Sequence, residues 1–173
     1  MRLKKVIIIS GTPGTGKTVL GKALVKEGKK GEHLELGEMI KKEGLYLGYD
    51  HGRDTLIMDE EKFREKIREI MEREGEEKEG FLVMDGHVSD LISKDLVDLV
   101  IVLKCNPKVL RERLKEKGYF EEKIEENVEA EIMEICLNDA LEAFGEEKIL
   151  VIDTSINSLE EAVEIVIEKL LEC

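Results

Sequence analysis

The sequence lacks any long apolar run. Its longest apolar stretch is five residues, whereas a membrane-spanning helix needs about 20. Its first residues, "MRLKK", lead directly into a short strand-like run, without the long apolar segment and cleavage site of a secretory signal. We therefore expect a cytoplasmic protein with no membrane partner. The length of 173 residues fits one domain (1–173) with a sizeable core.

Cysteine is also scarce. The chain has only Cys105, Cys136 and Cys173, and these lie far apart without a C-x-x-C pair or a Cys/His cluster. That spacing disfavours a zinc site and favours buried or inert thiols. Repeats and low-complexity linkers are absent as well.

Positive charge is in deficit. The 27 Lys and Arg residues face 40 Asp and Glu residues, which gives a formal net charge of −13. Such a surface repels phosphate-rich polymers, so direct nucleic-acid binding is not expected. A small phosphate ligand needs a local positive pocket, while the acidic surface as a whole suits a basic protein partner.

Short apolar runs alternate with amphipathic helical patterns along the chain. The expected strands are 5–10, 81–85, 99–104 and 148–153, with 33–36 as a further short candidate. The expected helices are 16–28, 59–74, 107–118 behind an Asn106 cap, 121–144, and 158–172 behind Ser158. Nearly continuous apolar strands separated by helices predict an α/β fold with a parallel sheet covered on both faces. Ligands bind such sheets beyond the carboxyl ends of the strands.

The long helix at 121–144 carries a further expectation. Its apolar residues are predicted to share one side, and they are Ile124, Val128, Ile132, Ile135 and Leu141.

The stretch "GTPGTGKT" (11–18) fits G-x-x-x-x-G-K-[ST] at every fixed position, follows a buried strand and opens a helix. Its backbone N–H groups are expected to hold the phosphates of ATP. The expected contacts in the loop are Gly14, Thr15 and Gly16. Lys17 would reach the β- and γ-phosphates, Thr18 would ligate Mg²⁺, and the Val19 amide would contact the α-phosphate. The alternative is a glycine-rich turn before an ordinary helix.

The stretch "VMDGHVS" (83–89) ends a second apolar strand. Asp85 fits the acidic partner that completes the magnesium shell, although aspartates also end strands and cap helices for structural reasons. His87 would project into the loop at the ligand end of the sheet. With an ordinary pKa of about 6.5, it could orient a water or contact a phosphate in either protonation state. Its alternative is a helix-start residue.

The chain is too short for a motor or a transporter ATPase, and it lacks the N-K-x-D signature of GTPases. Two segments instead indicate a nucleoside-monophosphate (NMP) kinase. The insertion 31–61 has a length that suits a flap over a second substrate, and in 111–127 Gly118 could hinge a short lid. A lid excludes water, so that the phosphate passes to an acceptor and not to solvent.

Four motifs together resemble one family: "GTPGTGKT", "LYLGYD" (45–50), the D-x-H of "MDGH", and "RERLKEKGY…NVEAEI". They are similar to the small adenylate-kinase-like proteins of archaea and the eukaryotic nucleus, the adenylate kinase isoenzyme 6 family. The resemblance implies a five-stranded parallel P-loop NTPase core, an AMP-binding flap near 35–58 and a lid near 116–126. It further implies phosphate transfer from ATP to AMP, ATP hydrolysis, assistance in small ribosomal subunit maturation and binding of the ribosomal protein uS11.

The resemblance also directs attention to four cations. Lys117 stands where family members carry an arginine before the lid glycine, and Arg113 is a second candidate for contact with the transferring phosphoryl group. Lys41 stands at an expected arginine of the flap, and Arg53 is another candidate for the AMP phosphate. For Arg113, Lys41 and Arg53, a solvated surface charge is the alternative.

Three functions remain open from the sequence: a metabolic AMP kinase, an ATP-driven ribosome assembly factor with secondary kinase activity, and a nucleotide-gated binding module. In each, adenine is expected between the loop after "VIDTS" and the helix that starts at Asn106, with Asn106 and Ser155 as its expected neighbours.

Overall fold

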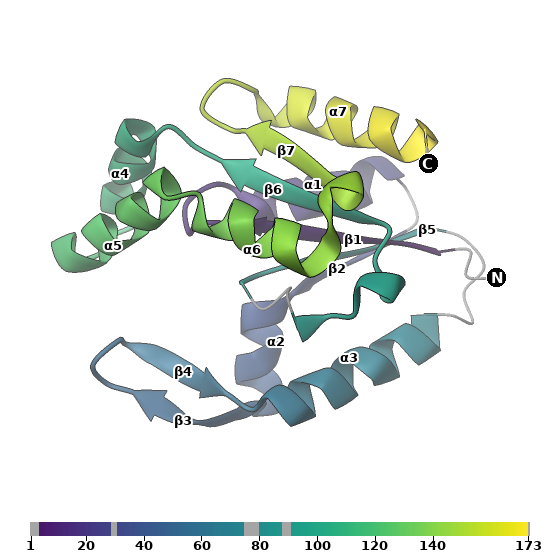
Figure 1. Cartoon of the computed structure of the whole chain (residues 1–173), viewed down its shortest axis with the longest axis horizontal. Coiled ribbons are helices and arrows are strands. Elements are labelled where there is room, and N and C mark those ends of the chain that lie inside the picture. Colours follow the sequence, from purple (N-terminus) through teal and green to yellow (C-terminus); the bar gives the residue numbers. More distant parts are fainter. Residues whose placement is uncertain (1–3, 29–30, 75–79, 88–90, 173) are drawn as a thin grey trace.

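Five strands form a single parallel sheet in the order β2-β5-β1-β6-β7. The computed structural model (Figure 1) describes residues 4–28, 31–74, 80–87 and 91–172. The strands are β1 (Lys4–Gly11), β2 (Gly31–Glu35), β5 (Gly80–Asp85), β6 (Leu99–Lys104) and β7 (Ile149–Asp153). The five-stranded parallel sheet is therefore confirmed, and 31–35 is its edge strand beside β5.

Helices cover both faces of the sheet because successive residues of a buried strand point to opposite sides. Ile7 and Ile9 of β1 pack in one core, beneath α1 (Lys17–Gly28) and α7 (Leu159–Glu172). Val6 and Ile8 pack in the other. That second core is covered by α2 (Leu36–Glu43), α3 (Glu60–Glu74) and α6 (Ile135–Phe144) (Figure 1).

The predicted helix caps are present. The Asn106 side chain accepts a hydrogen bond from the Lys108 amide at the start of α4 (Pro107–Glu116). Ser158 and Glu161 exchange hydrogen bonds at the start of α7, as in a capping box. Helix α4 ends before Gly118, whose φ of +78° turns the chain toward α5 (Glu121–Ile132).

The single long helix predicted at 121–144 is wrong. The chain forms α5 and α6, separated at Met133 and Glu134, and Glu134 has a φ of +54°. Helix α5 packs against α4, whereas α6 packs on β1 and β6, so one straight helix could not serve both neighbours. The shared apolar side is wrong too: Ile124 and Val128 are buried, but three residues are exposed, namely Ile132, Ile135 and Leu141.

The segment expected to form a flap contains α2 and an antiparallel hairpin of β3 (Tyr46–Asp50) and β4 (Thr55–Met58). Asp50 pairs with Thr55 next to the turn, and the Asp50 carboxylate accepts the Gly52 and Arg53 amides. In Figure 1 the hairpin and the α4–α5 pair lie on the same side of the molecule, beyond the carboxyl ends of the strands.

None of the helices within the described ranges combines the length and apolar composition needed to cross a bilayer. Cys105 is buried and Cys136 half-buried, both as free thiols. Burial raises the pKa of both, which favours the unreactive thiol form. Cys173 lies outside the described residues.

Candidate active site

The phosphate loop joins β1 to α1 at the carboxyl edge of the sheet. Gly14 and Gly16 have φ values of +90° and +100°, which residues with side chains rarely adopt. The Thr15 hydroxyl donates to the Thr12 carbonyl at 2.7 Å and holds the loop closed. Helix α1 then begins at Lys17, so its N-terminus and the loop amides lie together in an arrangement suited to an anion.

Lys17 lies over this loop. Its ammonium donates to the carbonyls of Gly11 at 2.6 Å and Thr12 at 3.2 Å. Burial lowers the pKa of Lys17 to about 8, and the positive charge of Lys117 adds to that effect. Lys17 is therefore still mostly charged at neutral pH and suited to bind phosphate.

Asp85 and Thr18 meet beside the loop because β5 is the neighbour of β1, with Asp85 opposite Ile9. The Thr18 hydroxyl lies 3.4 Å from Oδ1 of the buried Asp85. Hydroxyl and carboxylate oxygens are ligands that Mg²⁺ accepts, and two of them leave the other positions to water and phosphate. The two residues thus fit a magnesium ion.

His33 of β2 is a site residue that the sequence did not reveal. Its Nε2 lies 2.6 Å from Oδ2 of Asp85, and both side chains are almost fully buried, at 8% and 7% exposure. The strand candidate at 33–36 was visible in the sequence. Its place beside β5 was not, since no local pattern specifies which strands become neighbours.

His87 follows β5 and lines the clefts around the loop. His87 is exposed at the mouth of these clefts, yet desolvation against their walls lowers its pKa to about 4, and Lys17 and Lys123 act in the same direction. The expectation that either protonation state is accessible near neutral pH is therefore wrong: the imidazole is neutral. The helix start proposed as its alternative falls on 88–90, outside the described residues.

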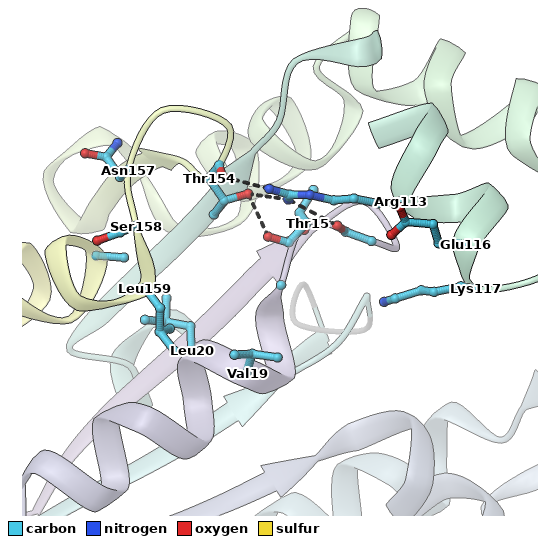
Figure 2. Close-up of a pocket in the computed structure, with 13 residues that line it drawn as sticks. Thr15, Val19, Leu20, Arg113, Glu116, Lys117, Thr154, Asn157, Ser158 and Leu159 are labelled. Carbon is cyan, nitrogen blue, oxygen red and sulfur yellow. Dashed lines mark hydrogen bonds between the residues drawn. The ribbon is translucent and has the colours of Figure 1, made fainter. Parts of the chain in front are cut away.

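A cavity of about 380 Å³ opens between the phosphate loop, the end of α4 and the loop after β7. Figure 2 shows Arg113 at its upper wall, where the guanidinium donates to the Thr154 hydroxyl at 2.9 Å and the Thr154 carbonyl at 2.8 Å. Thr154 in turn donates to the Thr15 carbonyl at 2.8 Å. Val19 and Leu159 contribute apolar surface, which gives a flat base a place to pack.

This arrangement differs from the expected one at two points. Arg113 belongs to α4 and is anchored to the wall of this cavity, so it does not project from the lid segment. Asn106 and Ser155 do not line the cavity; the Asn106 amide donates to the Ser155 hydroxyl at 3.1 Å instead.

A second, larger cleft of about 780 Å³ lies between the hairpin turn and the α4–α5 connection. Arg53 comes from the hairpin, His87 from the floor, and Lys117 and Lys123 from the opposite wall. Lys117 also lines the first cavity, so the two spaces meet at its side chain. Lys41 lies elsewhere: it pairs with Glu38 at 3.3 Å and borders a smaller cavity of about 260 Å³ with Asp85 and His87.

Comparison with known proteins agrees with this geometry. Residues 7–134 match the model of a family described as an AAA domain. The adenylate kinase isoenzyme 6 homolog of Schizosaccharomyces pombe is 40% identical over 90% of this chain and 83% of its own length. The Saccharomyces cerevisiae protein named adenylate kinase isoenzyme 6 homolog FAP7 is 36% identical over 80% of this chain and 67% of its own. The chain belongs to the adenylate kinase isoenzyme 6 family.

Membership of the adenylate kinase isoenzyme 6 family makes the protein a P-loop kinase of the NMP-kinase type. A solved structure of thymidylate kinase from Candida albicans shares its fold, with a TM-score of 0.61 over 98% of this chain and 92% of that one, at 13% identity. The family match spans the phosphate loop, Asp85 and the α4–α5 connection.

Proposed function

We propose that the protein transfers the γ-phosphate of ATP to AMP. The observation that carries this proposal is the meeting of two cavities at Lys117, one beside the phosphate loop and one beneath the hairpin. A kinase must hold donor and acceptor on either side of the group that moves, and a cation at their junction neutralises the charge of that group.

In this proposal ATP occupies the first cavity and the phosphate loop. Its adenine packs beside Val19 and Leu159, and Arg113 lies at the cavity wall near the base or ribose. The phosphates lie on the amides of the loop, with Lys17 at the β- and γ-phosphates. Thr18 and Asp85 would hold Mg²⁺, which supplies charge neutralisation at the phosphate oxygens.

In this proposal AMP occupies the second cleft. Arg53 at the hairpin turn is the stronger candidate for its phosphate, because Arg53 shares the cleft with Lys117 whereas Lys41 does not. Tyr119 and the 80% exposed Phe120 line the same cleft and offer aromatic surface to the acceptor base. Closure of the segment 116–126 over both substrates would exclude water.

The test compares ADP formation from ATP and AMP with phosphate release from ATP alone, for the wild type and Lys17→Ala. Loss of ADP formation in the variant by two or more orders of magnitude supports the proposal, since Lys17 is the half-buried cation of the loop. Near-wild-type ADP formation by Lys17→Ala would refute it. A panel of other nucleoside monophosphates identifies the preferred acceptor.

A second function is favoured by the charge of the chain. At −13, the acidic chain suits a basic partner, and we propose that ATP hydrolysis at the same site drives assembly of the small ribosomal subunit through uS11. The neutral His87 in the cleft could orient the attacking water. Capture of purified uS11 with and without ATP tests this role. Capture that depends on ATP without any turnover would instead support a nucleotide-gated binding module.

A further inference from the structure

We propose that His33 is a positioning residue that fixes the Asp85 carboxylate, and that Gly21 of α1 fixes His33 in turn. The proposal rests on the proposed role of Asp85 in holding Mg²⁺. It concerns how this chain orients the carboxylate, and it applies whichever monophosphate is the acceptor.

The two oxygens of Asp85 have different neighbours. Oδ2 lies 2.6 Å from Nε2 of His33, and Oδ1 faces the Thr18 hydroxyl at 3.4 Å. An ionised carboxylate only accepts hydrogen bonds, so the His33 nitrogen is the donor of this pair. Oδ2 is therefore held by His33, and Oδ1 points toward the phosphate loop, where the Thr18 hydroxyl lies.

The register of the sheet brings the two residues together. Strands β2 and β5 are parallel, with His33 opposite Val83 and Glu35 opposite Asp85. His33 and Asp85 consequently lie on the same face, the one that α1 covers. The imidazole reaches from the edge strand toward the end of β5 beneath that helix.

Gly21 closes the other side of the ring. A Cβ atom at Gly21 would lie 2.5 Å from both Cδ2 and Nε2 of His33, closer than any real contact allows. Gly21 is a buried residue inside a helix, where glycine costs about 1 kcal/mol relative to alanine. The imidazole therefore occupies space that any other residue at this position would take.

A fixed carboxylate matters because hydrogen bonds from the protein orient the ligands of a metal. Removing such a partner typically weakens metal binding by about 10- to 100-fold. Neutral histidine suffices as the donor, so the effect requires no change of protonation.

The experiment measures ATP affinity by titration calorimetry in Mg²⁺ and in EDTA. The ratio of the affinity in Mg²⁺ to the affinity in EDTA gives the contribution of the metal. His33→Phe keeps a planar ring but removes the donor, and we expect the ratio to fall about tenfold. His33→Gln retains an N–H donor and should recover part of that loss. His51→Phe, the same substitution at an exposed histidine of the hairpin turn, should leave the ratio unchanged.

Gly21→Ala provides an independent test that keeps His33. The added methyl displaces the ring, so the affinity ratio should fall. The thermal midpoint should change little, because the better helix propensity of alanine offsets the strain. If His33→Phe does not fold, the affinity ratio of Gly21→Ala tests the proposal in its place. An unchanged ratio in the folded variants, with only the thermal midpoint lowered, would show that His33 is a packing residue and overturn the proposal. An unchanged ratio in Asp85→Asn would refute the magnesium site itself, which separates the two failures.

Discussion

Lys17 combines burial with a positive neighbour, and both lower its pKa, to about 8 in the nucleotide-free protein. Bound phosphates favour the charged ammonium, so ATP affinity depends on the charged fraction of Lys17. That fraction is high below pH 8 and falls above it. We therefore expect the Kd for ATP to rise above pH 8, approaching about tenfold per pH unit, as measured by titration calorimetry.

Lys17→Arg is the control, because a guanidinium does not titrate in this range. If this variant binds ATP, its affinity should be flat between pH 7.5 and about 10. A wild-type affinity that is equally flat would contradict the assignment of Lys17 as the phosphate-binding cation.

His87 gives a second residue-scale prediction. Because burial lowers its pKa to about 4, His87 should add no ionisation of its own near the ordinary histidine value, so the pH profiles of kcat/KM for the wild type and His87→Ala should have the same shape there. His87→Ala should reduce ATP hydrolysis more than ADP formation, since a water must be oriented whereas AMP is held by cations. Both activities are measured on one preparation, with His51→Ala as the matched control. Equal losses would make His87 a structural residue.

Single residues differ in how far the sequence predicts them. Lys17 and Thr18 follow from a motif with fixed spacing, and Asp85 follows from the end of an apolar strand. His33 does not, because its contact with Asp85 depends on the strand order, which places 31–35 beside 80–85. The position of Arg113 also depends on tertiary structure: its partner Thr154 is 41 residues away in sequence.

At the scale of elements, Glu131 of α5 joins that helix to the phosphate loop. Its buried carboxylate accepts the Thr12 hydroxyl at 2.5 Å and the Cys105 amide at 2.8 Å. Glu131→Ala leaves the Cys105 amide without its acceptor and the Thr12 hydroxyl with only the Cys136 sulfur at 4.0 Å, so we expect about 3 kcal/mol of destabilisation. For a domain of this size that lowers the thermal midpoint by roughly 6–12 °C.

Glu129→Ala is the matched control, because Glu129 lies on the exposed face of the same helix. Its thermal midpoint should stay within about 2 °C of the wild type, since exposed positions contribute little. An equally small shift for Glu131→Ala would show that α5 is held by its apolar contacts with α4 alone.

The break between α5 and α6 shows where element prediction fails. Helical periodicity continues through 121–144, so the local pattern gives no reason to stop. The stop arises because Ile124 and Val128 pack on α4, whereas Ala140 and Phe144 pack on the sheet. The segment 46–58 is likewise predicted only as part of a flap. Its strands are not predicted, because they pair with each other in a separate two-stranded sheet and not with the main sheet.

At the scale of the whole molecule, an acidic chain encloses a cationic junction. The formal net charge is −13, yet Lys17, Lys117 and Lys123 gather around the clefts of the site. A small nucleotide can enter this local positive region, whereas a long nucleic acid meets the repulsive exterior. Composition alone predicts the acidic exterior. The cluster of lysines around the clefts can be seen only in the folded structure, because it brings together residues far apart in the sequence.

The proposed binding of basic uS11 should therefore depend on salt, because the long-range attraction between exposed charges is screened. Between 50 and 300 mM salt, we expect the association rate to fall by about an order of magnitude, while dissociation changes less. Surface plasmon resonance with immobilised uS11 measures both rates, and ATP affinity over the same range reports whether the site stays intact. An association rate indifferent to salt would mean that apolar contacts, and not the acidic surface, select the partner.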